Sequence, residues 1–125
     1  MIFPSGHRCA PLDTVRLADL DGEDDVDRLA CEMREMVMNV LGERKVLLHA
    51  KCRSKRADWV QTMVLSGLGF ACIPEHSVTK ASLPSRALVE PAVARDVQAI
   101  DVRGRERTPA AALVRKGLST FGWPG

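Results

Sequence analysis

The sequence lacks a long apolar run and a surplus of charge of either sign. No stretch approaches the roughly 20 apolar residues that a membrane span needs, and the start, MIFPSGHRCAP, lacks the apolar segment of a secretory signal. The 18 Lys and Arg residues nearly balance the 16 Asp and Glu residues, so charge alone predicts no attraction to nucleic acid. The length of 125 residues predicts a single domain with a genuine core. We therefore expect a cytoplasmic protein with no membrane partner.

Paired cysteine motifs are also missing. No C-x-x-C occurs, and the near-even spacing is poor for a zinc site or a redox pair; the four cysteines are Cys9, Cys31, Cys52 and Cys72. His49 and Cys52 form the most suggestive metal-binding pair, but side chains three residues apart on a strand point to opposite faces. We expect no metal and no cofactor, and we expect the thiols to behave as small buried hydrophobes.

Nucleotide-binding and catalytic motifs are absent as well. The stretch SGLGFACIPE, residues 66–75, sets Gly67 and Gly69 one residue apart, but a dinucleotide loop has a third glycine where Cys72 stands. Such a loop also leads from a strand into a helix, whereas this pair is expected to lead from a helix into a strand. No Walker, G-x-S-x-G or H-E-x-x-H sequence occurs, and no nucleophile has a visible base. We expect no catalytic residues and no enzyme.

The first half of the chain has alternating helical and strand patterns. Apolar residues recur at helical spacing from Val26 to Leu41, which predicts an amphipathic helix with Asp24 or Asp25 as its cap and Gly42 in the turn that ends it. Residues 46–52 are rich in Val and Leu and predict a strand.

A second helix and strand follow. Ser54 is the expected cap of a helix that carries Trp59 and ends at Gly67. Residues 69–73 are apolar and predict a buried strand of a parallel sheet, closed by Pro74 because proline cannot donate to a central ladder. The order helix, strand, helix, strand predicts βαβ winding.

The second half has weaker patterns. Residues 87–89 and 97–102 predict two short strands, the latter by its alternation of side chains. Thr108 followed by Pro109 marks the start of a last helix, and Gly117 interrupts its far end, which we expect to fray.

The order of these segments carries a resemblance. The chain runs from GHRCAPLDTVRLADLDGE through a helix and a strand into RSKRADWVQTMVLSGLGFACIPE, then LVEP and RGRERTPAAALVRKGL. This order resembles the carboxy-terminal part of LysR-type transcriptional regulators. No single motif is specific, but their order and spacing match over nearly the whole chain.

The resemblance implies a periplasmic-binding-protein-like α/β fold and a small-molecule effector. On that mapping, residues 1–125 form a partial effector-binding domain, in which residues 13–74 form the second subdomain and residues 75–125 return to the first. The DNA-binding winged helix of the family lies upstream of the matching region, so we expect a truncated module that contacts DNA only through a domain absent from this chain. The implied partners are another copy of the chain or a full-length regulator.

The resemblance also implies an effector site at the start of the second predicted helix. Free amides and the dipole of a helix start favour anions, and arginine suits bidentate recognition of a carboxylate. The candidate effector-binding residues are Arg53, Ser54, Arg56 and Pro74. A capping serine among solvated charges is the alternative for this segment.

An alternative function is a small stand-alone α/β binding protein or a thiol-dependent enzyme of the same architecture. Such an enzyme would use Cys52 or Cys72 as its nucleophile, and it would require a reactive thiol at neutral pH.

Overall fold

The structure is a computed structural model that describes residues 1–123, and its chain divides into two compact units. Unit 1 is Met1–Arg95, and unit 2 begins at Asp96. Each unit is described by itself. The elements of unit 1 are β1 (Thr14–Arg16), η1 (Leu17–Leu20), β2 (Asp24–Arg28), α1 (Glu32–Arg44), β3 (His49–Ser54), α2 (Ala57–Leu65), η2 (Glu75–Ser77) and β4 (Ala87–Val89). Unit 2 contains α3 (Pro109–Thr120).

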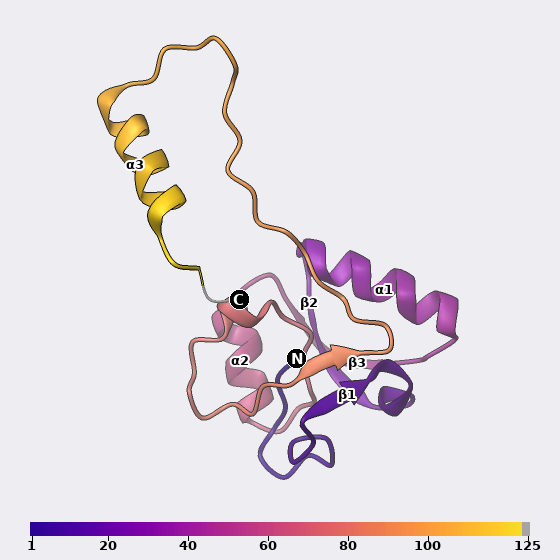
Figure 1. The fold of residues 1–125 in the computed structure, drawn as a ribbon. Coiled ribbons are helices and arrows are strands. Elements are labelled where there is room, and N and C mark those ends of the chain that lie inside the picture. Colours follow the sequence, from indigo (N-terminus) through magenta and orange to yellow (C-terminus); the bar gives the residue numbers. More distant parts are fainter. Residues whose placement is uncertain (124–125) are drawn as a thin grey trace. The chain divides into compact units, whose positions relative to one another are not determined.

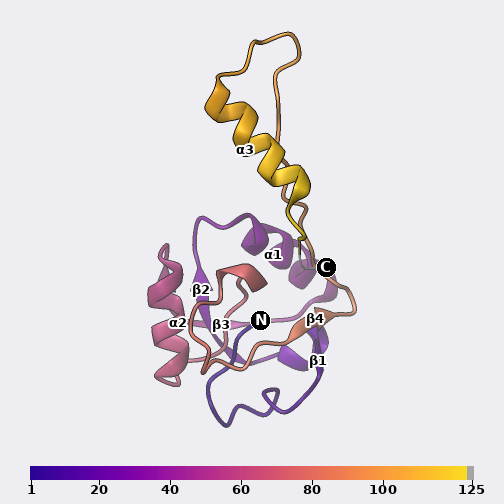
Figure 2. The same ribbon diagram turned by 60° about the vertical axis from the view of Figure 1, so that its left-hand side comes forward.

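A βαβ arrangement forms the centre of unit 1, as the sequence predicted. β2 and β3 pair in parallel and are joined through α1. The chain then passes through α2, and Phe70 bridges in parallel to Asp25 of β2. β2 is therefore paired on both sides, by β3 and by the backbone at Phe70. Figure 1 and Figure 2 show α1 and α2 on opposite sides of this sheet.

Each face of the sheet has its own apolar core. Successive residues of an extended chain point to opposite faces, so the neighbours Phe70 and Ala71 belong to different cores. The core that includes the α1 residues is Phe3, Cys9, Val15, Leu17, Leu20, Val37, Leu41, Val46 and Phe70. The core that includes the α2 residues is Ile2, Val26, Val60, Val64, Ala71, Ile73 and Leu83.

The backbone at Gly69 approaches β2 closely. Gly69 has a φ of +148°, and a Cβ placed there would collide with the backbone carbonyl of Asp24. Only glycine fits both the dihedral angle and the space. The Gly67-x-Gly69 pair is thus the turn from α2 into the segment beside β2, as predicted, and Gly67 follows the helix end with a φ of +82°.

Two short segments from the ends of unit 1 pair with each other. β1 and β4 form a parallel two-stranded sheet in which Val15 lies opposite Leu88. Figure 2 shows the two strands side by side. β4 has the bounds predicted for it. Ile2 bridges antiparallel to both Ala71 and Ser85, and so ties the start of the chain to the central sheet.

The first helix starts later in the structure than the predicted start at Val26. Residues 24–28 form β2 instead of a helix cap and first turn, and α1 starts at Glu32 after Cys31. The cause is the position of the acidic residues: Asp27 is buried and paired with Arg34 of α1. Gly42 lies inside α1, and Lys45 takes the left-handed conformation that ends it, with a φ of +56°.

Three further boundaries differ from prediction. β3 spans His49–Ser54 rather than residues 46–52, because its ladder follows the partner β2. The N-cap of α2 is Arg56, not Ser54, and no side chain caps this helix. Residues 69–73 form only isolated bridges, at Phe70 and Ala71, although both residues are fully buried.

Unit 2 consists of an irregular segment and α3. Thr108 is the N-cap of α3, as predicted, and its side chain accepts a hydrogen bond of 3.2 Å from the N–H of Ala111. The helix continues through Gly117 to Thr120. The strand predicted at residues 97–102 is wrong: no neighbouring backbone pairs with these exposed residues in the part of unit 2 that is described.

Candidate functional site

The start of α2 brings together two of the four predicted site residues. The Arg56 N–H donates a hydrogen bond of 3.1 Å to Ser54 Oγ, so Ser54 shapes the turn that leads from β3 into α2. The N-cap residue of α2 makes no side-chain hydrogen bond to the first amides, and the anion nearest to this helix start is the Asp58 carboxylate, which interacts with the backbone amides of Asp58 and Trp59. Arg56 supplies an exposed guanidinium at this position.

The Arg56 guanidinium already has partners in the structure. It pairs with Asp58 through hydrogen bonds of 3.1 and 2.6 Å, and these hold the pKa of the Asp58 carboxyl below its ordinary value. The same guanidinium lies 5.7 Å from the centroid of the Trp59 ring. Both carboxylate and ring are exposed, so this arrangement is open to exchange with an incoming anion.

Arg53 points toward a different set of side chains. Its neighbour Cys52 packs against the core that includes the α2 residues, and strand alternation turns Arg53 to the α1 side of the sheet. There Arg53 Nε lies 3.5 Å from Asp27 Oδ2. The structure therefore separates Arg53 from the pair formed by Ser54 and Arg56.

Pro74 lies at the end of the segment that bridges to β2. It precedes η2, and its carbonyl accepts a hydrogen bond of 2.9 Å from the N–H of Ser77. Because this segment runs parallel to β2 and β3, Pro74 and Ser54 both follow carboxyl ends of parallel backbone at one edge of the sheet. No contact joins Pro74 to the other three predicted residues among the described interactions.

The structure adds a charged cluster that the sequence analysis missed. Arg34 of α1 donates two hydrogen bonds to Asp27, of 2.5 and 2.9 Å, and Asp27 is only 8% exposed. Asp25 lies two residues earlier on the same side of β2, and one of its carboxylate oxygens is buried without a partner. Burial and the nearby Asp27 raise the pKa of Asp25 to about 6. The alternation of Asp25, Val26 and Asp27 was the available strand signal, but the acidic side chains favoured a helix start.

The cysteines carry no sign of nucleophilic chemistry at the two positions where a pKa shift is resolved. Burial raises the pKa of the Cys72 thiol to about 12, and burial also raises the pKa of Cys9. Both groups therefore stay protonated at neutral pH. The thiolate, not the thiol, is the nucleophile, so neither residue is suited to nucleophilic catalysis there. Within residues 1–123, no three His, Cys, Asp or Glu side chains are grouped as metal ligands.

None of the helices described is both long and apolar enough to cross a membrane.

Three solved structures resemble this chain in fold. The C-terminal domain of a protein from Rhodococcus sp. RHA1, described as a LysR family transcriptional regulator, is 22% identical with a TM-score of 0.61 over 74% of the chain. HinK, a LysR family transcriptional regulator from Pseudomonas aeruginosa, is 24% identical with a TM-score of 0.71 over 90%. The PA01 protein of the same organism, also described as a LysR family regulator, is 23% identical with a TM-score of 0.73 over 95%.

These likenesses show a periplasmic-binding-protein-like α/β fold, as the sequence predicted. The chain spans 48%, 40% and 44% of the length of the three structures. No curated protein matches the chain. The family model described as the LysR substrate binding domain matches residues 1–120. The chain belongs to the family of LysR substrate-binding domains.

Proposed function

We propose that this chain senses a small anionic effector for a LysR-type transcriptional regulator, and that the anion binds at the start of α2. The observation that carries the proposal is a helix start without an N-cap side-chain hydrogen bond, with the Arg56 guanidinium beside it and the Ser54 hydroxyl two residues before Arg56. The first amides of α2, the helix dipole and the guanidinium all attract a carboxylate or phosphate at the same place.

The present partner of Arg56 is a weak competitor for such a ligand. Asp58 is more than half exposed, and exposed ion pairs contribute roughly 0–1 kcal/mol. A ligand carboxylate held by the guanidinium and by the amides of α2 gains hydrogen bonds to charged groups, each worth about 1.5–3 kcal/mol. An anionic effector therefore displaces Asp58 and uses the same bidentate geometry.

We include Arg53, whose side chain turns to the α1 face of the sheet, and Pro74 as outer parts of the proposed site. Arg53 is 64% exposed and adds positive charge from β3, while Pro74 offers a half-buried apolar ring at the end of the neighbouring segment. Ligands of open α/β sheets bind outside the carboxyl ends of the strands, which is where these residues lie.

The regulatory role follows from the family. We propose that residues 13–74 form one subdomain and that residues 75–125 return to the other; residues 124 and 125 lie outside those described. Effector binding between subdomains shifts the arrangement of the regulator, and DNA is contacted through a helix-turn-helix domain on another segment or chain. Assembly with a second copy or with a full-length regulator links the two events.

Thermal unfolding with a panel of small carboxylates and phosphates tests the anion site. A ligand that binds only the native state stabilises it by about 2.7 kcal/mol at a concentration 100 times its dissociation constant. We expect one compound class to raise the midpoint measured by circular dichroism. We expect the rise to be lost when Ser54→Ala and Arg56→Ala are combined.

Arg103→Ala is the matched control because Arg103 is an exposed arginine of unit 2. This variant should keep the ligand-induced rise in full. A rise that survives in the Ser54→Ala, Arg56→Ala double variant would contradict the proposed site. A midpoint that no compound changes would contradict anion sensing by the chain itself.

A further inference from the structure

The helix α2 buries one polar side chain beside its apolar ones. Gln61 is 1% exposed, nearly as buried as Val60 and Val64 of the same helix. Burying a side-chain amide costs free energy unless its donor and acceptor groups are paired. The hydrogen-bond partners of Gln61 therefore decide what this residue does, and they come from two separate segments of backbone.

The Nε2 atom of Gln61 joins the start of α2 to the turn that follows Pro74. It donates a hydrogen bond of 3.2 Å to the carbonyl of Ala57, the first residue of α2, and one of 3.1 Å to the carbonyl of Ser77. The Ser77 N–H in turn donates a hydrogen bond of 2.9 Å to the Pro74 carbonyl. Because Arg56 directly precedes Ala57, this chain of hydrogen bonds connects two parts of the proposed site that make no direct contact among the described interactions.

The Oε1 atom of Gln61 holds the next part of the same segment. It accepts hydrogen bonds of 2.9 Å from the Thr79 N–H and 3.2 Å from the Lys80 N–H. Val78 packs against the core that includes the α2 residues. Apolar contact is non-directional and keeps residues 74–80 near α2, whereas hydrogen bonds are directional and fix the position of this segment along the helix.

We propose that Gln61 is a positioning residue of the effector site, which holds the turn at Pro74 in place beside the start of α2 so that one ligand contacts both. This role rests on the proposed function, in which an anion binds at the start of α2 and Pro74 offers an apolar surface. Gln61 is buried and acts through the backbone of Ala57 and Ser77. Holding both surfaces ready before the ligand arrives lowers the cost of binding.

Amide hydrogen exchange tests the link between the two segments without a ligand. Gln61→Met keeps an unbranched side chain and removes the hydrogen bonds to Thr79 and Lys80. These two amides should then exchange about five to ten times faster, as expected when each loses one hydrogen bond. Val64→Ala is the matched control, since Val64 is fully buried in the same helix. It should lower the thermal midpoint without selectively accelerating these two amides.

Probe binding tests whether the link serves a ligand. Inorganic phosphate supplies charge alone, whereas straight-chain carboxylates from acetate to hexanoate add an apolar tail that can contact Pro74. Backbone amide shifts of Ala57 and Ser77 report the affinity for each probe. In the wild type we expect affinity to rise with chain length, by up to about fourfold for each methylene that is buried.

Variants of Gln61 should change the chain-length dependence and not the binding of charge. Gln61→Met should flatten the rise and leave phosphate affinity unchanged. Gln61→Glu keeps an acceptor but supplies at most one donor, so we expect an intermediate rise. Val64→Ala should keep the full rise, because it alters packing and leaves the hydrogen bonds of Gln61 in place.

The outcomes separate this proposal from the anion site. A wild-type chain that binds neither phosphate nor any carboxylate would reject the anion site, and with it the role of Gln61 there. A rise with chain length that Gln61→Met leaves intact, or that Val64→Ala removes equally, overturns Gln61 as a positioning residue while the anion site stands. The absence of any rise in the wild type overturns it too. Unchanged exchange of the Thr79 and Lys80 amides in Gln61→Met would reject the link itself.

Discussion

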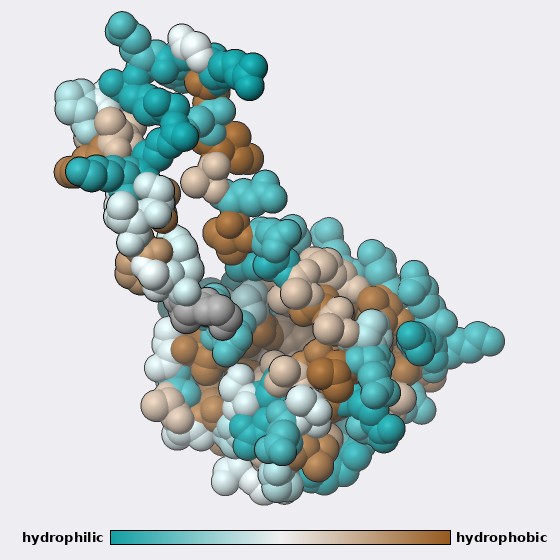
Figure 3. All heavy atoms as spheres, in the orientation of Figure 1, coloured by the Kyte–Doolittle hydropathy of each residue, from teal (hydrophilic) through white to brown (hydrophobic). Residues whose placement is uncertain are grey.

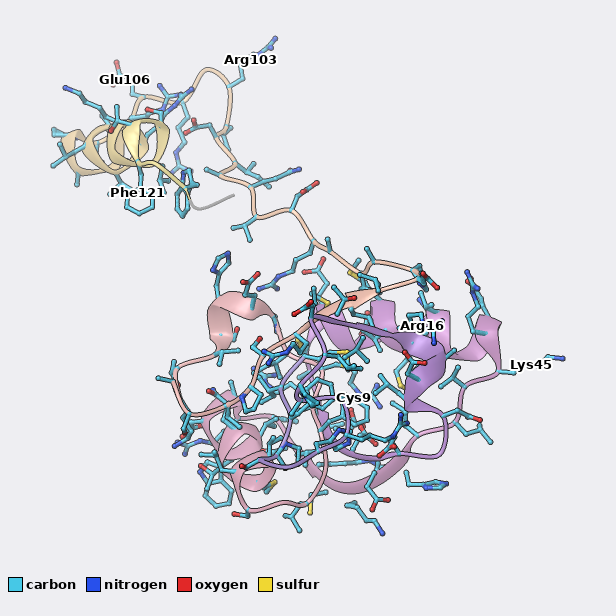
Figure 4. All side chains as sticks on the ribbon, turned by 60° about the horizontal axis from the view of Figure 1, so that its bottom comes forward. Cys9, Arg16, Lys45, Arg103, Glu106 and Phe121 are labelled. Atoms are coloured by element: carbon cyan, nitrogen blue, oxygen red, sulfur yellow. The ribbon has the colours of Figure 1, made fainter. Side chains whose placement is uncertain are left out.

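Units 1 and 2 both contain an amphipathic helix, but α2 buries apolar side chains, whereas α3 buries none among the residues that the structure describes. α2 in unit 1 buries Val60 and Val64 completely. α3 in unit 2 leaves Leu113 71% exposed and Val114 62% exposed, and Figure 3 shows hydrophobic side chains on the outside of this unit. Figure 4 shows Cys9 within unit 1, whereas Arg103 and Glu106 project from unit 2.

The different burial of α2 and α3 shows that a helix can be specified by its own residues without being stabilised by tertiary packing. Thr108, Pro109 and good helix formers are enough to specify α3, because capping and propensity act within a few residues. An isolated helix of 12 residues is nevertheless marginal in water, since most helical stability comes from packing. Unit 1 should therefore unfold cooperatively, and α3 should respond to local changes.

The largest expected effect comes from removing a core ring. Phe70→Ala removes a fully buried ring that stacks 5.8 Å from Phe3, and we expect it to lower the free energy of unfolding of unit 1 by about 3–5 kcal/mol. Phe121→Ala is the matched control because Phe121 is 58% exposed in unit 2. Urea unfolding, followed by the fluorescence of Trp59 in a Trp123→Phe background, measures both. Equal losses would show that the two units share one cooperative core.

A smaller effect is expected from Gly69. Gly69 has a φ of +148°, and Gly69→Ala forces a Cβ into the backbone of Asp24. We therefore expect this change to lower the free energy of unfolding of unit 1 by more than about 2 kcal/mol. Gly104 of unit 2 also has a positive φ, of +79°, but nothing lies within 4 Å of an added Cβ. Gly104→Ala should leave the urea midpoint of unit 1 unchanged. A Gly69→Ala protein as stable as the wild type would contradict the close approach of this turn to β2.

Sequence reasoning succeeded where the determinants are adjacent in the chain. The turn at Gly67 and the cap at Thr108 depend on neighbouring residues, and both were predicted. The bounds of β4 were also predicted, although β4 forms its ladder with the distant β1. β2 was missed because its aspartates favour a helix start locally, and only the fold supplies Arg34 as a partner for Asp27. The predicted strand at residues 97–102 failed for the converse reason: alternation alone forms no ladder without a neighbouring strand.

The candidate site shows the same division. Ser54 and Arg56 are two residues apart, and the hydrogen bond between them follows from that spacing. Asp25 and Cys72 meet in one pocket although 46 other residues separate them in the sequence. No local pattern brings them together, because their proximity depends on the chain returning beside β2 at Phe70.

The smallest effect expected is a pH dependence whose sign differs between the two units. Asp25 has a pKa of about 6 when folded and 3.8 as its ordinary value, so the folded chain holds this proton more tightly. Its contribution to stability is fully present below about pH 4 and is lost as the pH rises through 6. Asp25→Asn should therefore raise the free energy of unfolding of unit 1 at pH 7 by about 1 kcal/mol. This value is reduced for solvent screening because the group is only partly buried. The gain in the free energy of unfolding should shrink toward pH 4.

The pKa shift of Asp101 in unit 2 gives a pH dependence of stability with the opposite sign. Hydrogen bonds from Arg107 lower the pKa of its carboxyl, so any stability it lends is present above its ordinary pKa and is lost as the pH falls through the folded value. Helicity of α3 should accordingly decrease in acid, and Asp101→Asn should remove that decrease without changing the pH profile of unit 1. Urea unfolding of unit 1 and circular dichroism of α3 at the helix band, each followed against pH, distinguish the two pH dependences.

If Asp25→Asn gave the same gain in the free energy of unfolding at pH 4 as at pH 7, the gain would not come from the proton that Asp25 binds in the folded chain.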